Sequence, residues 1–230
     1  MEKPLYPSPY MRITQGYMIG SHKDSYAIDE GGMDTGIDHI KAPFTGVIKK
    51  IYTADANEVW LESSDKVEYP DGTIDYMTVL FAHDNDISNL FIGKIINRGE
   101  IFYQEGTKGN TTGNHCHIEC GRGKFTGTGW HKNSSGGWSI NNGKKPEECF
   151  WVDDSIRILN NNGYTFKMIE SKNIIPEGEN KTPEVKPEES KTDNSSENTT
   201  DTTKPKLIFI CKSEDIYAIK LKEGKKLYLE

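Results

Sequence analysis

The chain lacks features that would assign it to several familiar classes of protein. No run approaches the ~18 apolar residues that a membrane helix requires, and the mean hydropathy is −0.70. No cluster of Lys and Arg is present, and the 230 residues carry a formal net charge of −7. Nucleic-acid binding depends on clustered basic side chains. We therefore expect neither membrane insertion nor a nucleic-acid partner.

The N-terminus also lacks the apolar core and small-residue cleavage site of a secretory signal. The expectation is a protein that is made and kept in the cytoplasm. If its target lies outside, another factor must release it.

Cysteine is scarce, and its four positions, 116, 120, 149 and 211, form no dense disulfide framework. We expect each to be a reduced, buried, small hydrophobe. A thiolate metal site built from Cys116 and Cys120 is disfavoured, because their spacing differs from the usual Cys-x-x-Cys knuckle.

Helical periodicity is rare, whereas short β-prone runs separated by turn residues are common. Pro70-Asp71-Gly72 is a turn signal that predicts a long antiparallel hairpin between residues 58–62 and 73–82. The best helix candidate is 151–160, which has apolar residues at helical spacing and an Asn-Asn-Gly stop. The predicted fold is mainly β, an antiparallel sheet groove with irregular loops and a short helix, plus a small β segment at the C-terminus.

Composition divides the chain into three parts. Residues 1–168 form the predicted main domain. Residues 169–206 are dominated by Pro, Glu, Lys, Thr, Ser and Asn, which predicts a flexible linker. Residues 207–230 turn apolar again and predict two or three strands, too few for a stable domain. This segment would be a strand-exchanged oligomerisation element, a truncated wall-binding module or a piece docked on the main domain.

The run 113–120 places two histidines two residues apart in a β-prone segment. Alternate side chains of a strand share a face, so His115, His117 and Glu119 should project together. Cys116, Ile118 and Cys120 should point to the opposite side, into a core. Imidazole and carboxylate are zinc ligands, and catalytic zinc sites use three protein ligands and one open position. Taken alone, the pair fits two surface histidines equally well.

Other candidates precede this run in the chain. His22 stands in a loop before a short strand-like run that ends at Asp29, and His83 follows the second strand of the predicted hairpin. Standing alone, each of these residues would be expected in a solvated loop or at a strand end.

The order His22, Asp29, Ala42-Pro43, a hairpin ending in Phe81-Ala82-His83, and then Gly113 to Glu119 resembles the lysostaphin-type zinc endopeptidases, which cut peptidoglycan cross-links. The resemblance covers roughly residues 12–125, about half of the chain.

This resemblance implies zinc bound by His22, Asp29 and His117, with His115 and His83 beside the open position. Zinc would lower the pKa of its bound water towards ~7 and polarise the scissile carbonyl. His115 would activate or orient the water. His83 would stabilise the oxyanion or protonate the leaving amine, and these two roles are exchangeable.

The chain departs from the family pattern in three places. Six residues separate His22 from Asp29, where the family commonly has three, so Asp24, Asp34 and Asp38 compete as the carboxylate ligand. Residues 30–41 form an insertion that carries His39, which we expect to be an exposed loop histidine. Asn114 and Cys116 stand where the family often has Pro and Leu.

Further residues extend the candidate site. Glu119 would orient a zinc ligand or simply pair with a surface cation. The Gly-rich loop around Trp130 and Trp138 would grip a peptide or sugar, or pack on the sheet as an ordinary surface loop. His131 belongs to this loop and is not expected to be a ligand.

A catalytic domain, a linker and a C-terminal module resemble the layout of phage endolysins, which accumulate inside the host and reach the Gram-positive wall when a holin permeabilises the membrane. The expected partner is therefore peptidoglycan. The alternatives are a tail-associated lysin and a metal-free wall-binding protein of the same fold. The bond cleaved stays open between a D-Ala to diamino-acid link and a glycine-containing bridge.

Overall fold

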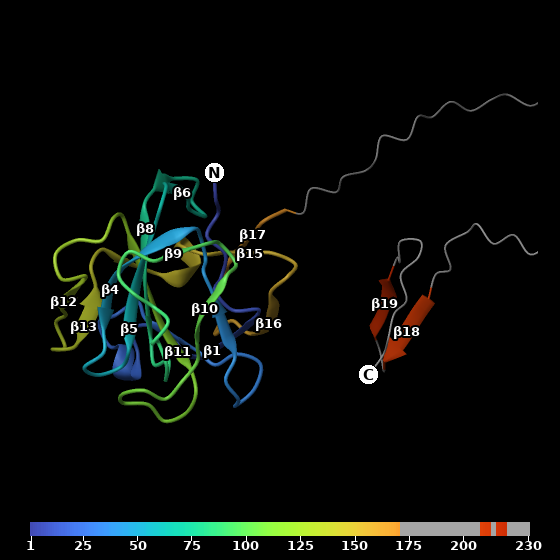
Figure 1. The fold of residues 1–230 in the computed structure, drawn as a ribbon, viewed down its shortest axis with the longest axis horizontal. Coiled ribbons are helices and arrows are strands. Elements are labelled where there is room, and N and C mark those ends of the chain that lie inside the picture. Colours follow the sequence, from blue (N-terminus) through green and yellow to red (C-terminus); the bar gives the residue numbers. More distant parts are fainter. Residues whose placement is uncertain (171–207, 213–214, 220–230) are drawn as a thin grey trace, which may run out of the picture. The chain divides into compact units, whose positions relative to one another are not determined.

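The computed structural model describes residues 1–170, 208–212 and 215–219 (Figure 1). The chain divides into two units, residues 1–175 and 176–230. In the second unit, β18 (Ile208–Lys212) and β19 (Asp215–Ile219) form an antiparallel pair. Nearly all of the predicted linker, and the rest of the C-terminal segment, lie outside the described residues. The boundaries at 168 and 206 therefore stay predictions.

A nine-stranded sheet runs through the first unit in the order β16-β1-β2-β11-β8-β5-β4-β9, with β14 paired to β11. Neighbouring strands are antiparallel, except that β1 and β16 are parallel. The strands are β1 (Tyr10–Gln15), β2 (Ile28–Glu30), β4 (Gly46–Tyr52), β5 (Glu58–Ser63), β8 (Met77–Ala82), β9 (Ile95–Ile96), β11 (Cys116–Arg122), β14 (Gly143–Lys144) and β16 (Arg157–Asn160).

Four two-stranded pairs complete the unit. They are β3 (His39–Lys41) with β10 (Ile101–Gln104), β6 (Val67–Glu68) with β7 (Ile74–Asp75), β12 (Trp130–Lys132) with β13 (Trp138–Ile140), and β15 (Trp151–Val152) with β17 (Lys167–Met168). The prediction of a mainly antiparallel β fold is confirmed. So is the long hairpin, because β5 pairs with β8 and the β6–β7 pair extends towards the turn at Gly72, whose φ is +83°.

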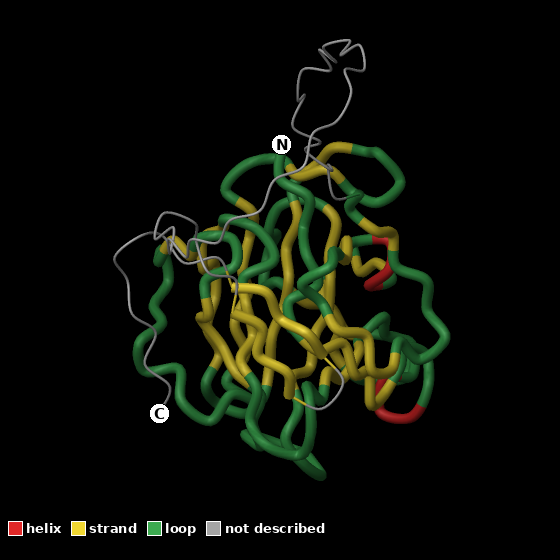
Figure 2. Tube along the Cα trace, turned by 90° about the vertical axis from the view of Figure 1, so that its right-hand side faces the viewer, coloured by secondary structure: helices red, strands yellow, loops and turns green. Residues whose placement is uncertain are grey.

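The predicted helix at 151–160 is wrong. These residues form β15, a turn and β16, and the described residues contain only two short 3₁₀ turns, η1 (Gly20–His22) and η2 (Pro146–Glu148) (Figure 2). The Asp153 carboxylate accepts a hydrogen bond from the Ser155 N–H at 2.9 Å, which forms a local turn that competes with a helix. Distant strands then pair with both halves, β17 with β15 and β1 with β16.

None of the helices among the described residues has the length and apolar character needed to cross a membrane.

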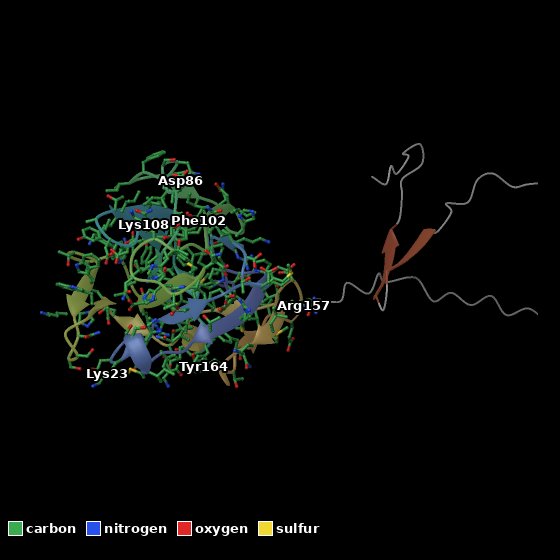
Figure 3. The ribbon with its side chains drawn as sticks, turned by 90° about the horizontal axis from the view of Figure 1, so that it is seen from below. Lys23, Asp86, Phe102, Lys108, Arg157 and Tyr164 are labelled. Carbon is green, nitrogen blue, oxygen red and sulfur yellow. The ribbon has the colours of Figure 1, made fainter. Side chains whose placement is uncertain are left out.

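The core lies under one face of the central sheet. Cys116, Ile118 and Cys120 alternate along β11 and are fully buried, as the pattern predicts. Full burial of an aliphatic side chain such as Ile118 contributes about 1.5–3 kcal/mol. Phe102, on β10 and labelled in Figure 3, packs edge-to-face against Phe81 with ring centroids 5.2 Å apart. The opposite face of β11 is therefore left for polar side chains.

Cys116, Cys120 and Cys149 are unpaired and buried, which confirms the predicted reduced state for these three. Burial raises the pKa of the Cys116 and Cys120 thiols well above the usual value, so they stay protonated. The side chain of Cys211 lies outside the described residues.

Candidate metal centre

Strand pairing brings together residues that are far apart in the sequence. His117 on β11 pairs with Asp29 on β2 at one side and with Ala82 on β8 at the other. His83 directly follows β8, and His115 directly precedes β11, where it bridges to Gly106. Strand pairing thus gathers Asp29, His83, His115 and His117 where β8 ends and β11 begins, in the middle of the sheet.

One oxygen of Asp29 is the centre of this group. Asp29 Oδ1 lies 3.2 Å from His22 Nε2, 3.1 Å from His117 Nδ1 and 3.6 Å from His115 Nε2. The candidate ligand atoms of His22, Asp29 and His117 all lie within 4.8 Å of one another. The structure therefore brings the three predicted zinc ligands to one point.

In His22 and His117, the ring nitrogen that faces away from Asp29 indicates which nitrogen carries the proton. His22 Nδ1 lies 3.0 Å from the Gly16 carbonyl, and His117 Nε2 lies 3.3 Å from Glu119 Oε1. Carbonyl and carboxylate oxygens only accept, so these nitrogens must be the donors. In a neutral ring the other nitrogen then presents a lone pair. Both lone pairs face the Asp29 carboxylate, and such acceptors repel one another unless a cation or a proton lies between them.

The spacing fits zinc. Four ligands at about 2.0–2.2 Å in a tetrahedron lie about 3.3–3.6 Å from one another. The distances from Asp29 Oδ1 to the two imidazole nitrogens are 3.2 and 3.1 Å. Two imidazoles and one carboxylate also form a common ligand set of catalytic zinc sites. His22, Asp29 and His117 are thus suited to hold this ion.

Electrostatics favour a positive charge at the same point. Burial alone would lower the pKa of His117, but hydrogen bonds to Asp29 and Glu119 outweigh it and raise the pKa to about 10. Burial would likewise raise the pKa of Asp29, but its bonds to His117 and His22 hold that pKa far below the ordinary range. A proton takes the cation's place in the metal-free protein, so metal and protons must compete.

His83 and His115 flank this group with the same donor pattern. Their Nδ1 atoms bond the carbonyls of Lys108 at 2.7 Å and Gly113 at 2.9 Å, and His115 Nε2 lies 3.6 Å from Asp29 Oδ1. The two ring centroids are 4.6 Å apart. Burial lowers the pKa of His83 to about 4, so this ring is neutral at pH 7.

The backbone around His83 is tightly constrained. Its φ of +91° is rare for a residue with a side chain. A Cβ added to Gly106 would lie 2.2 Å from the His83 carbonyl oxygen, so only glycine allows this approach. The chain thus holds His83 in an unfavourable conformation through its neighbours.

Comparisons with known proteins give distant similarities. No family model matches the chain. Morphogenesis protein 1 of Bacillus phage B103 is 28% identical over 177 residues, which are 70% of this chain and 43% of that protein. The chain thus spans less than half of this relative's length.

Two solved structures illustrate the structural similarities. A zinc-containing peptidase from Vibrio cholerae is 18% identical over 53% of this chain and 37% of its own, with a TM-score of 0.40. The catalytic domain of the antimicrobial peptidase lysostaphin from Staphylococcus simulans is 19% identical over 63% of this chain and 89% of its own, with a TM-score of 0.38.

The competing carboxylates lie elsewhere. Asp24 accepts from the Ser134 hydroxyl, Asp38 accepts from the Met33 N–H, and Asp34 accepts from the Gly36 N–H. None of the three belongs to the cluster of potential ligands found among the described residues. Asp29 therefore remains the carboxylate of choice.

The longer spacing between His22 and Asp29 has a local explanation. The Ser25 N–H donates to the His22 carbonyl at 3.0 Å, and the Ala27 N–H donates to Ser25 Oγ at 3.1 Å. The extra residues thus form a turn that returns the chain to the start of β2.

The remaining predicted residues lie at different distances from this centre. Glu119 is buried and bonds His117, so it contacts a candidate ligand rather than a surface cation. Trp130 and Trp138 pack together with ring centroids 5.6 Å apart, and Trp138 is 58% exposed. His39 is exposed, as expected, but it lies on strand β3 rather than in a loop, because residues 39–41 pair with β10. His131 is exposed on β12.

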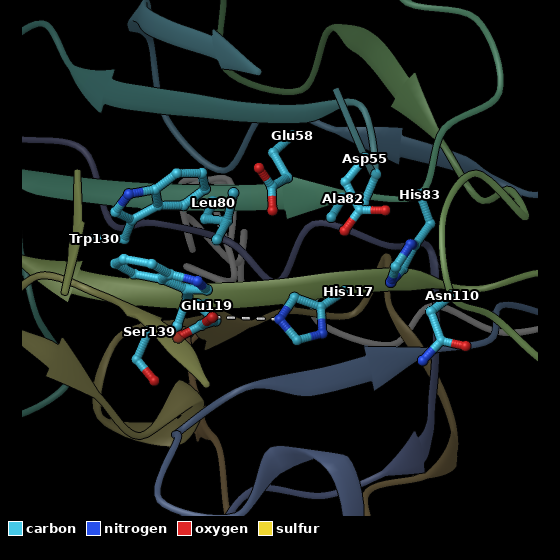
Figure 4. A pocket seen from close by; sticks show the side chains of 12 residues that line it. Asp55, Glu58, Leu80, Ala82, His83, Asn110, His117, Glu119, Trp130 and Ser139 are labelled. Carbon is cyan, nitrogen blue, oxygen red and sulfur yellow. Dashed lines mark hydrogen bonds and ion pairs between the residues drawn. The ribbon is translucent and has the colours of Figure 1, made fainter. Parts of the chain in front are cut away.

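A cavity of about 170 Å³ adjoins the centre and was not predicted from the sequence (Figure 4). His83 and His117 line one part of it, and Trp130 and Trp138 line another. Glu58 lies between these two parts in Figure 4. The predicted strand at 58–62 contains Glu58, but the face of the sheet on which its side chain lies follows only from the pairing of β5 with β8.

Proposed function

We propose that the chain is a zinc-dependent endopeptidase that cleaves peptide cross-links of Gram-positive peptidoglycan, and that it acts as a phage lysin. One observation carries the proposal. His22 Nε2 and His117 Nδ1 converge on Asp29 Oδ1 at 3.2 and 3.1 Å, an arrangement of ligand atoms that a bound cation would stabilise.

Zinc bound there would supply Lewis-acid chemistry and a nucleophilic water at neutral pH. Asp29 and the two histidines would hold it, and Glu119 would keep His117 in the correct tautomer. The Nδ1 atoms of His115 and His83 each bond a backbone carbonyl, so Nε2 is the nitrogen that each ring offers to the site. Either can accept a proton from water and return it to the departing amine, so their two roles remain exchangeable.

The surroundings suit an extended polymer substrate. The cavity beside the centre is open to solvent and continues to the exposed Trp138 ring. Aromatic rings pack well on peptide and sugar faces. We therefore assign substrate contact to Trp130 and Trp138.

The phage relative supports a phage origin, and two roles in the phage cycle follow. An endolysin would stay in the host cytoplasm until lysis and then reach the wall. A virion-borne lysin would act at infection, and the relative's name, a morphogenesis protein, favours this second role. Detection of the protein in purified virions would select the virion-borne role, and its absence there would select the endolysin.

The test of the zinc mechanism joins metal analysis to activity. We expect one zinc per chain by elemental analysis. We also expect clearing of Gram-positive wall suspensions that chelation abolishes and zinc restores. His117→Ala should lose both zinc and clearing, whereas the matched variant His131→Ala, which changes an exposed histidine outside the centre, should keep both.

Other outcomes would contradict the proposal. Clearing that is indifferent to chelator and to His117→Ala would refute the zinc mechanism. Wall binding without clearing by a protein that holds no metal would select the wall-binding alternative.

A further inference from the structure

The cavity beside the metal centre has its floor on the polar face of the central sheet. Leu80 pairs with Trp60 on β5 and with Glu119 on β11, so these three residues form one row across three strands. His117 pairs with Ala82 in the next row on the same face. Glu58 belongs to this second row, because it directly precedes Val59, which pairs with Phe81. Side chains two residues apart on a strand share a face.

The small residue in the second row creates the space. Ala82 stands between Glu58 and His117, and its methyl group leaves room where a larger side chain would fill the gap. The resulting cavity, here called the Glu58 pocket, is lined by Asp55, Glu58, Ala82, Trp130 and Trp138 among others (Figure 4). At about 170 Å³ it is smaller than the roughly 300–1,000 Å³ of sites for whole ligands. It is therefore suited to one arm of a larger substrate.

The carboxylate of Glu58 is not satisfied within the protein. Its Oε2 atom is buried and has no hydrogen-bond partner. Burial raises the pKa of Glu58 to about 7, against the opposing effects of His117 and Lys50. A buried, unpaired carboxylate oxygen is costly, and a donor that carries positive charge compensates it best.

The other acidic groups around the pocket differ in how far they are engaged. Glu119 accepts from Ser25 Oγ and from the Ile140 N–H, both at 3.0 Å, and also contacts His117. Asp55 lines the pocket, and its charge adds to that of Glu58. The uncommitted negative charge of the pocket is therefore concentrated at Glu58 and Asp55.

Lys50, a neighbouring cation, is engaged elsewhere. Its ammonium donates to the Thr128 carbonyl at 2.6 Å and lies 3.6 Å from the ring centroid of Trp130. Trp138 contacts Trp130 and keeps 58% of its surface exposed. Tryptophan is the best aromatic partner for cations, so the pocket offers a further cation both a carboxylate and an aromatic wall.

We propose that the Glu58 pocket binds a free primary ammonium of the peptide substrate, and that Glu58 selects substrates that carry one. The source of the ammonium is an unacylated side-chain or terminal amine of a wall peptide. This assignment rests on the proposed function for its substrate class. It predicts that acylation of this amine weakens binding, so the protein distinguishes stem peptides by the state of their amine.

The test uses two stem peptides that differ in one group. Both are N-acetylated L-Ala-γ-D-isoglutaminyl-L-Lys-D-Ala, one with a free lysine ammonium and the other with an acetylated one. Binding is followed by tryptophan fluorescence in the presence of a chelator, so that no cleavage occurs. The wild type should bind the free-amine peptide about tenfold more tightly, the effect of one hydrogen bond to a charged group.

Matched variants test whether the preference for the free-amine peptide depends on Glu58. Glu58→Gln should reduce it to about twofold or less. Glu148→Gln, which removes the same charge at an exposed position of turn η2, should keep the preference. Ala82→Val narrows the pocket without changing any charge and should weaken both peptides. Thermal melting shows whether each variant is folded.

Equal binding of the two peptides by the wild type would overturn the proposal, and so would an unchanged preference in Glu58→Gln. Unchanged binding of both peptides by a folded Ala82→Val would exclude the pocket as their site. Failure of the zinc-loaded protein to cleave wall peptides, with the amine preference intact, would refute the endopeptidase function and leave the ammonium site standing.

Discussion

Glu119→Gln changes one atom near the metal centre and should switch the tautomer of His117. In the native protein, Glu119 Oε2 accepts from Ser25 Oγ and from the Ile140 N–H, and Oε1 accepts from His117 Nε2. Glutamine has the same shape but offers one acceptor oxygen and one donor NH₂ group. Two donors face the Oε2 position, so the amide oxygen must occupy it.

The NH₂ group then faces His117, and the tautomer reverses. His117 Nε2 must become the acceptor, which moves the ring proton to Nδ1. Nδ1 lies 3.1 Å from Asp29 Oδ1 and would donate to it instead of presenting a lone pair. The variant would thus exchange a metal ligand for an internal hydrogen bond.

The expected size of this effect follows from groups that act similarly in other metal sites. Loss of such a supporting carboxylate typically weakens metal binding 10–100-fold, which is about 1.4–2.8 kcal/mol. The metal-free fold should lose less than about 1.5 kcal/mol, because His117 Nδ1 keeps its bond to Asp29 and a bond from the glutamine NH₂ to Nε2 replaces the one to Glu119.

Competition with a chromophoric chelator measures the zinc affinity, and denaturant unfolding without metal measures the free energy of unfolding. Glu62→Gln is the matched control, since Glu62, on β5 two strands from β11, also accepts from a backbone N–H, that of Phe125 at 2.6 Å. It should leave the zinc affinity unchanged. A zinc affinity of Glu119→Gln within twofold of wild type would refute the tautomer reasoning.

Three further variants test the fold around the site. Ile118→Ala should cost about 2–5 kcal/mol in denaturant unfolding, because it opens a cavity in the core; a cost below 1 kcal/mol, on the order of a surface change, would contradict its burial. Gly106→Ala should lower both stability and activity, because its Cβ would collide with the His83 carbonyl; a fully active variant with an unchanged melting temperature would exclude that contact. Burial raises the pKa of Glu105 to about 8 from 4.5, so its protonated form stabilises the fold below about pH 4.5, and this stability is lost as the pH rises through 8. Glu105→Gln should therefore flatten a decline of at most about 1.4 kcal/mol per pH unit in unfolding free energies measured across this window; an unchanged slope would refute it.

The sequence predicted those features that depend on short-range pattern. The alternation of 115–120 predicted both faces of β11, since a half-buried strand must alternate. The turn at 70–72 predicted the hairpin because Pro and Gly have strong backbone preferences. The segment 151–160 was misread as a helix, because tertiary pairing with β1 and β17 overrides a weak local pattern.

Glu58 shows why part of the site could not be predicted. Its strand was recognised, but the face it presents depends on register, and a shift of one residue would send its side chain to the other side. The β6–β7 pair and its irregular flanks separate β5 from β8, so the turn at 70–72 does not by itself set the register at Glu58. The family resemblance that located the histidines also gave no information on Glu58, because this residue lies outside the shared motifs.

The pairing of distant strands has a consequence for how the chain folds during its synthesis on the ribosome. β1 and β2 pair with each other, but the second partner of each strand is made much later. β2 joins the rest of the sheet through β11, after residues 116–122 have been made, and β1 pairs with β16 only after residues 157–160. Long-range pairing of this kind slows folding. His117 is made 88 residues after Asp29. A completed metal centre therefore reports that synthesis has passed β11 and that the sheet has formed around it.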